Sequence, residues 1–248
     1  MNNIARILVI YITVLLISAC AAPDESATNQ AAKNAGFLTD YALLSKPDWE
    51  GVVKAVYIDP QLARTVERYS GVMVDQPEVF ISVASPYRGV KPDGIKMVAD
   101  QMRFLLIGEM LRSGYNVVEA PGEDIVYLRV ALTDLDVAKV AGASGYVPIA
   151  EGEQGEAERV RAFMSTLRVI DVNVEMELVD SVTSQVIIAA IAKAEFSADQ
   201  TDALSGWAGL YRVLEGLSAG ISCLVNKASI PADARLDICR GVTALTVP

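Results

Sequence analysis

The chain has 248 residues, of which 52% are hydrophobic, and its formal net charge at pH 7 is −10. This length and composition suffice for one sizeable core, whereas the acidic balance and the lack of a basic run disfavour nucleic acids as partners. The chain contains no histidine, which excludes Ser-His-Asp and Cys-His catalytic arrangements and most zinc sites.

Residues 1–19 are expected to be an export signal. Arg6 precedes an apolar run, Ile7 to Ile17, and two small residues, Ser18 and Ala19, follow it, which is the order of parts in a secretory signal. A transmembrane anchor is the alternative. However, a spanning helix needs about 20 apolar residues, and this run is shorter.

The four residues that end at Cys20, Ile-Ser-Ala-Cys, resemble the lipobox of bacterial lipoproteins. The resemblance implies that the Cys20 thiol receives diacylglycerol, that the signal is cut before this cysteine, and that the new amine is acylated, for example with palmitate. Several acyl chains on one residue anchor a protein stably, because each buried methylene contributes about 0.8 kcal/mol. An ordinary signal peptide with an incidental cysteine is the alternative.

Residues 20–34 are small and polar, so we expect a flexible tether, followed by a single domain at 35–248. In Gram-negative bacteria, lipoproteins retained on the inner membrane typically carry Asp directly after the lipidated cysteine. This chain has Ala21 there. If the host is Gram-negative, the resemblance therefore implies the periplasmic leaflet of the outer membrane, with the membrane as a partner through the lipid.

The first part of the domain is expected to begin with a short docking segment, in which Phe37, Leu38, Tyr41 and Leu44 recur at helical spacing. Three elements are expected to follow it. They are a strand from Val52 to Ile58, a turn or two of helix within Gln61–Ser70, and a buried strand from Val79 to Ala84.

A longer helix is expected to begin at Pro92 and to end at Gly114, a residue that tolerates positive φ. Its apolar side chains form one stripe, which consists of Ile95, Val98, Met102, Leu105 and Leu106. A short strand, Tyr115 to Glu119, and an alternating strand, Ile125 to Thr133, are expected next.

Residues Ala141–Glu158 are rich in Gly, Ala and Glu, so we expect a long loop, either functional or a solvated extension. A hairpin is then expected, with strands from Ile170 to Leu178 and from Val186 to Phe196 joined by a turn at Asp180–Ser184. A helix from Leu204 to Lys227 closes the regular structure.

Two pairs of acidic residues are candidates for chemistry. Glu175 and Glu177 lie on the same face of one strand, where paired carboxylates could serve acid–base catalysis, although charges on a solvated sheet face are the simpler interpretation. Asp134 and Asp136 could bind calcium, but no EF-hand spacing surrounds them. We therefore assign no catalytic residue, no metal site and no cofactor.

With Cys20 lipidated, Cys223 and Cys239 remain as a pair in an oxidising compartment, which favours a disulfide. Two buried free thiols are the alternative, because sequence alone does not show that the two side chains meet.

The order of strands and helices favours an α+β fold, with a mainly antiparallel sheet, helices packed on one face, and a single domain.

Several short stretches together resemble a family of proteobacterial lipoproteins that is defined only as a domain of unknown function. These stretches are GFLTDY from Gly36, YIDP from Tyr57, GYNVV from Gly114, and the block Asp124–Leu132. The resemblance spans roughly Gly36–Cys223 and transfers no activity or functional residue.

Two functions follow as hypotheses. The first is a non-enzymatic binding or assembly module of the cell envelope, with another envelope protein as its partner through a sheet edge or the Ala141–Glu158 loop. The second is a periplasmic hydrolase or lyase that uses carboxylates. An exposed apolar patch or strand edge favours the first, and a deep cavity that converges on carboxylates favours the second.

Overall fold

A computed structural model of the chain describes residues 35–47, 53–61, 69–140, 155, 158–159, 162–195 and 206–227. The expected signal peptide and tether lie outside these residues, as do Cys239 and most of the expected Gln61–Ser70 helix and Ala141–Glu158 loop. The strands and helices all belong to one compact unit, Phe37–Pro248. Their bounds in chain order are η1 Tyr41–Leu43, β1 Val53–Ile58, β2 Gly71–Val74, β3 Glu78–Ile81, α3 Pro92–Arg112, β4 Asn116–Val117, β5 Ile125–Lys139, β6 Leu167–Asp180, β7 Val186–Glu195 and α6 Gly206–Lys227.

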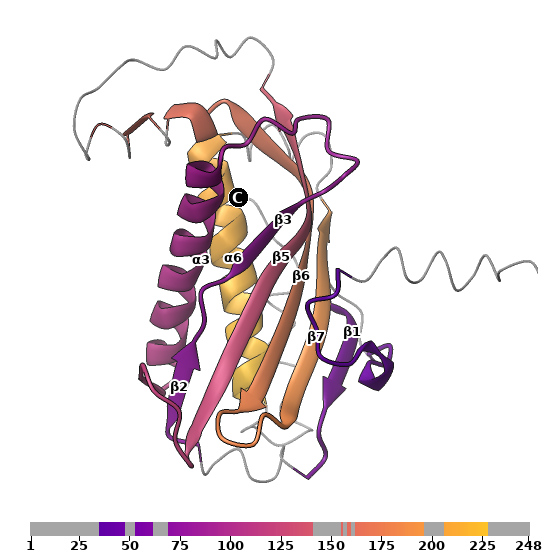
Figure 1. Cartoon of the computed structure of the whole chain (residues 1–248), viewed down its shortest axis with the longest axis vertical. Coiled ribbons are helices and arrows are strands. Elements are labelled where there is room, and N and C mark those ends of the chain that lie inside the picture. Colours follow the sequence, from indigo (N-terminus) through magenta and orange to yellow (C-terminus); the bar gives the residue numbers. More distant parts are fainter. Residues whose placement is uncertain are drawn as a thin grey trace, which may run out of the picture. The chain divides into compact units, whose positions relative to one another are not determined.

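Seven strands form one sheet in the order β1-β7-β6-β5-β2-β4, and β3 pairs with β5 (Figure 1). The β1–β7, β6–β7 and β5–β6 pairs are antiparallel, whereas β2 and β3 run parallel to β5, and β4 runs parallel to β2. The fold is therefore α+β with a mixed sheet, and the prediction of a mainly antiparallel sheet was wrong. The physical reason is α3, which serves as the crossover that parallel neighbours require.

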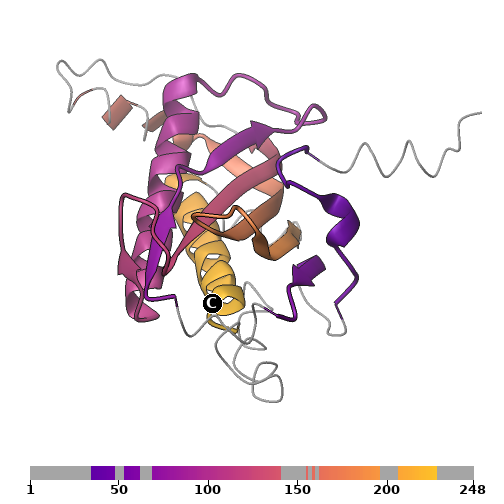
Figure 2. The same ribbon diagram turned by 60° about the horizontal axis from the view of Figure 1, so that its bottom comes forward.

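Helices α3 and α6 pack side by side on one face of the sheet (Figures 1 and 2). The expected stripe of α3 faces the core: Val98, Met102 and Leu106 are buried, and Ile95 is half-buried. From α6, Leu210, Leu214 and Ile221 join the same core. Burial of these two apolar stripes against the sheet is the main stabilising contribution to the fold.

The expected buried strand at Val79–Ala84 is instead an edge strand. Within the described residues β3 pairs with β5 alone, and its side chains alternate between exposed and half-buried. Phe80 is 42% exposed, and Val83, just beyond the strand, is 80% exposed. A short apolar run does not distinguish a strand buried on both sides from an edge strand, so the prediction of burial was wrong.

The longest strand, β5, extends six residues past the expected end at Thr133, to Lys139. Its pairing register with β6 shifts between Thr133 and Asp136, and Asp134 within this stretch has a φ of +49°. This irregularity is a β-bulge, which bends the strand and lets pairing continue beyond it.

The N-terminal segment Phe37–Ser45, here called the strap, lies on the sheet face opposite the helices (Figure 2). Phe37, Leu38 and Ala131 form a small second core there, separate from the main one. The strap is also joined to β1, because Ser45 and Val56 exchange backbone hydrogen bonds of 3.0 and 2.9 Å. The expected docking of this segment onto the core is confirmed.

Candidate functional site

Two short rows of side chains cross the strap-covered face of the sheet. Since side chains alternate between the faces of a strand, residues paired across three strands point the same way. One row places Glu177 of β6 between Arg129 of β5 and Ala189 of β7, and the next places Glu175 between Ala131 and Ile191. The two glutamates are thus neighbours on one face, as the sequence predicted.

Glu177 is 0% exposed. Its Oε1 accepts a hydrogen bond from the backbone N–H of Thr39 at 2.5 Å, and its Oε2 accepts one from the Thr39 hydroxyl at 3.0 Å. Oε2 also accepts from the Nη1 of Arg129 at 2.8 Å, which completes an ion pair. Both oxygens therefore have partners, as burial of a charged group requires.

Glu175 is 1% exposed, and its Oε2 accepts a hydrogen bond of 2.5 Å from the Tyr41 hydroxyl. The same phenol oxygen accepts from the backbone N–H groups of Phe37 at 3.0 Å and Leu38 at 3.3 Å. Burial and the hydrogen bond to Glu175 raise the pKa of Tyr41 above its usual value, so the hydroxyl stays protonated and donates to the carboxylate.

Phe37 of the strap contacts Arg129, the third charged residue of this face. The guanidinium carbon of Arg129 lies 4.8 Å from the centroid of the Phe37 ring, which is within the range of a cation–π interaction. Arg129 is thus held between a carboxylate and an aromatic ring, while its side chain keeps 28% of its surface exposed.

The interpretation of Glu175 and Glu177 as charges on a solvated face was wrong, because the strap covers both carboxylates. Within the described part of the chain both carboxylates are covered, whereas the catalytic alternative required them to face an open cavity. The residues that sequence reasoning missed are Thr39, Tyr41 and Arg129, which hold the pair. Their signal was present: the GFLTDY stretch supplies two side-chain donors beside two large apolar residues.

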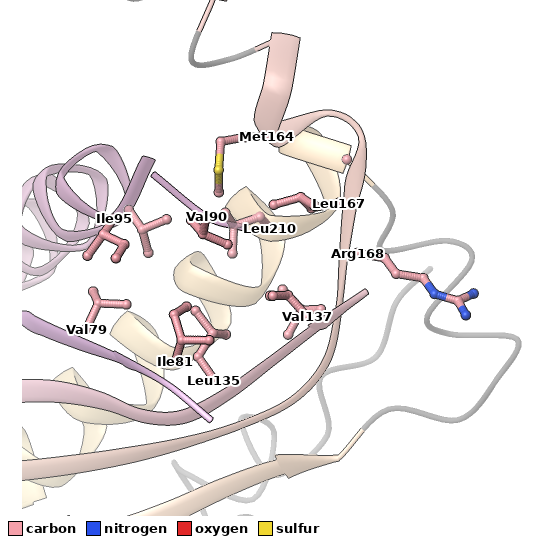
Figure 3. A pocket seen from close by; sticks show the side chains of 13 residues that line it. Val79, Ile81, Val90, Ile95, Leu135, Val137, Met164, Leu167, Arg168 and Leu210 are labelled. Carbon is pink, nitrogen blue, oxygen red and sulfur yellow. The ribbon is translucent and has the colours of Figure 1, made fainter. Parts of the chain in front are cut away.

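An apolar hollow lies on the other side of the sheet, between β3, α3 and the first residues of α6 (Figure 3). It encloses about 400 Å³ of empty space, its open mouth included. The lining residues include no carboxylate, and the one charged residue among them, Arg168, points its guanidinium away from the hollow (Figure 3). The side chains that Figure 3 shows around the hollow are Val79, Ile81, Val90, Ile95, Leu135, Val137, Met164, Leu167 and Leu210.

The remaining candidates do not assemble into a site. Asp134 Oδ2 accepts a hydrogen bond of 3.2 Å from the side chain of Asn173, and among the described residues no three potential metal ligands gather around it or Asp136. Cys223 lies in α6, and both Cys20 and Cys239 lie outside the described residues. Lipidation and the disulfide therefore stay predictions.

The fold defines a class: an α+β protein with two helices on one face of a mixed sheet and an N-terminal strap on the other. Within that class the chain belongs to the family described as "Protein of unknown function (DUF3313)", whose model matches residues 33–221. No curated protein matches the sequence. Among the described residues, no helix is both long and apolar enough to cross a bilayer.

The solved structures that are similar to this chain include the following three. PelC of Paraburkholderia phytofirmans, solved as a dodecamer, is 17% identical with a TM-score of 0.38, over 73% of this chain and 100% of that chain. A minor lipoprotein of Acinetobacter baumannii is 10% identical with a TM-score of 0.31, over 66% and 97% of the two chains. A DUF4136 family protein of Bacteroides thetaiotaomicron is 12% identical with a TM-score of 0.37, over 73% and 100%. These values assign no activity, ligand or assembly to this chain.

Proposed function

We propose that the chain is a lipid-anchored protein of the bacterial cell envelope whose folded part is a non-enzymatic binding module. The lipobox that ends at Cys20 supports the anchor. In a Gram-negative host the protein resides in the periplasmic leaflet of the outer membrane. The proposal accords with the family's description, which names no activity.

One observation carries the choice of a binding module over a hydrolase or lyase. The carboxylates that the enzymatic alternative needs, Glu175 and Glu177, are buried under the strap and bonded to it. The apolar hollow on the other face is open, but no carboxylate is among the described residues that line it. A catalytic acid or base must reach the proton it transfers, and neither location combines carboxylates with access.

The binding surface that we propose consists of the hollow and the adjoining edge strand β3. Val79 and Ile81 line the hollow, whereas Phe80 points to the opposite face of β3 and Val83 follows the strand, and both of these expose apolar surface along the edge. An edge strand offers unpaired backbone groups as well, and exposed apolar side chains beside such an edge are typical of protein–protein contacts. The partner is therefore an envelope protein that presents an aliphatic side chain and an extended backbone.

The anchor is tested by metabolic labelling with an alkyne fatty acid in cells that express the chain. Wild type and the control Cys223→Ala are expected to take up the label, and Cys20→Ala is expected to lose it. Membrane fractions of the same cells then show whether the labelled protein sediments with the outer membrane. Label retained by Cys20→Ala would contradict the anchor.

The binding surface is tested with a photo-crosslinking amino acid at position 83 in intact cells. We expect a discrete adduct whose partner is identified by mass spectrometry and is lost when Phe80→Asp is added. The control carries the crosslinker at position 182, where Val182 is 60% exposed in the β6–β7 turn. The same adducts from both positions, or none from position 83, would refute this surface.

A further inference from the structure

The contact between the strap and the sheet differs in kind from the main core. The core joins α3 and α6 to the sheet through apolar side chains, whereas the sheet face under the strap centres on three charged groups, Glu175, Glu177 and Arg129. The apolar part of the strap contact is a smaller cluster of Phe37, Leu38 and Ala131, with Tyr41, Leu44 and Ile191 packed against it. Hydrogen bonds to charged groups therefore make a larger contribution to the strap contact than to the main core.

Lifting the strap would carry a smaller hydrophobic penalty than separating the helices from the sheet, because its apolar cluster is much smaller than the main core. On the sheet it would uncover Glu175, Glu177 and Arg129 besides Ala131 and Ile191, and water hydrates free carboxylates and guanidinium groups well. Burial of such charges offsets much of the attraction between them, so a contact of this type gains specificity more than stability. By contrast, separating α3 from the sheet would expose wholly apolar residues such as Met102 and Leu106. Of these two contacts, the one between the strap and the sheet is therefore better suited to repeated release and rebinding.

The strap is recognised by side chains at alternate positions. Phe37 covers Arg129, Thr39 donates twice to Glu177, and Tyr41 donates to Glu175. Asp40, between the last two, is exposed. The sheet face thus contacts three features of the strap that are two residues apart. They are the ring of Phe37, the hydroxyl and backbone N–H of Thr39, and the phenol of Tyr41.

We propose that the face formed by Arg129, Glu175 and Glu177 is a peptide-binding site, which the chain's own strap occupies in the closed form and releases as a unit. Its ligand is the strap itself, whose Phe37, Thr39 and Tyr41 give the pattern aromatic-x-Thr-x-Tyr. This site lies on the sheet face opposite the hollow, and it requires neither the lipid anchor nor the partner at β3.

The test uses the full-length purified chain and a fluorescent peptide of residues 35–45, AGFLTDYALLS. Peptide binding is measured by fluorescence anisotropy for wild type and for the double variant Thr39→Val/Tyr41→Phe, which has a weakened strap. The double variant is expected to bind the peptide at least tenfold more tightly, because the strap no longer competes as strongly for the face. Adding Glu177→Gln to this variant is expected to weaken binding at least tenfold, since the face then loses its charge.

Two controls separate recognition from general loosening of the fold. A peptide with Val at position 39 and Phe at position 41 is expected to bind at least tenfold more weakly than the wild-type peptide. Tyr87→Phe removes a hydroxyl that donates to the Gly89 carbonyl at 3.3 Å, away from the strap, and is expected to bind like wild type. Equal binding by the weakened-strap and wild-type chains, or equal binding of both peptides, would overturn the proposal.

If the double variant does not fold, hydrogen exchange of the wild-type chain tests whether the strap is released as a unit. Release of the strap as a unit requires the amides of Thr39 and Ser45 to exchange together and faster than those of Met176 and Leu178 in β6. Exchange at the rate of the β6 amides would mean that the strap leaves only on global unfolding, and the proposal would be wrong. Because no lipid or partner enters these measurements, their failure is distinct from failure of the proposed function.

Discussion

At the scale of single residues, three carboxylates of β6 are buried, each with hydrogen-bond partners from other segments. Glu175, Glu177 and Asp180 are 1%, 0% and 5% exposed, yet the sequence of the strand indicated charges in solvent. Alternation of apolar and acidic residues specifies which face each side chain occupies, but not what covers that face. Glu175 and Glu177 are covered by a segment more than 130 residues away in the chain, and Asp180, on the other face, is bonded to Tyr69, 111 residues away; no local pattern reveals either contact.

Glu177→Gln is predicted to lower the free energy of unfolding by about 2 kcal/mol. The amide loses the ion pair with Arg129, and its –NH₂ group cannot accept from Thr39. Urea denaturation measures the change. Asp100→Asn, which removes an exposed ion pair with Lys96 on α3, is the control and should stay within about 0.5 kcal/mol of wild type. A loss as small as that of the control would contradict the role of Glu177.

Asp180 makes stability depend on pH. Burial acts to raise the pKa of this carboxyl, but hydrogen bonds from the Thr183 backbone, the Tyr69 hydroxyl, the Thr183 hydroxyl and the Val182 backbone outweigh burial and lower the pKa to about 2. Because the folded pKa is below the unfolded value of 3.8, the stabilisation is complete above that value and is lost as the pH falls towards 2.

Asp180→Asn is accordingly predicted to cost about 1 to 2 kcal/mol near neutral pH, and the difference from wild type should vanish between about pH 4 and pH 2. Denaturant titrations across this pH range provide the measurement. Asp93→Asn, at an exposed position in the first turn of α3, is the control. A difference between wild type and Asp180→Asn that persists unchanged at pH 2 would refute this account.

At the scale of elements, the predictions from sequence succeeded where one periodic pattern determines the outcome. The helices α3 and α6, the hairpin β6–β7, and strands β1 and β5 were all identified, because each has an apolar stripe or alternation of sufficient length. Strand β2 has only four residues and was missed, and the parallel pairing of β2 and β3 with β5 was not recognised. Pairing direction depends on where a crossover helix returns the chain, which is a property of several elements together.

The two glycines near the end of α3 are predicted to respond in opposite ways to alanine. Gly114 has a φ of +85°, a conformation that is strained for any side chain, so Gly114→Ala should lose about 1 kcal/mol. A Cβ atom added at Gly108 would meet nothing within 4 Å, so Gly108→Ala should gain about 0.5 to 1 kcal/mol from helix propensity. Thermal unfolding of the two variants tests both signs, and a shift in the same direction would refute the argument.

At the scale of the whole molecule, much of what defines the protein depends on residues that lie far apart in sequence. The α+β class, the layer of helices and the docked N-terminus followed from sequence, whereas the strap contacts and the apolar hollow did not. Both of these are formed by segments from three or more elements. The strap contacts and the apolar hollow therefore form only when those segments pack together in the folded protein.

A disulfide between Cys223 and Cys239 is predicted to fasten the C-terminal residues to α6. A loop of this size should contribute about 3 kcal/mol to the free energy of unfolding, so reductant or Cys239→Ala should lower stability by that amount. Intact-mass analysis after alkylation, with and without reductant, counts the thiols. Two thiols that react in the native, unreduced protein would contradict the pairing.

The position of the strap in the sequence also affects the order in which parts of the domain fold. Thr39 and Glu177 are 138 positions apart, and a chain made from its N-terminus produces the strap long before β6 exists. Contacts of such high sequence separation form late, after the intervening elements have condensed. The part of the domain that is synthesised first is therefore among the last to reach its final place during folding, and until then Glu175 and Glu177 are not covered by the strap.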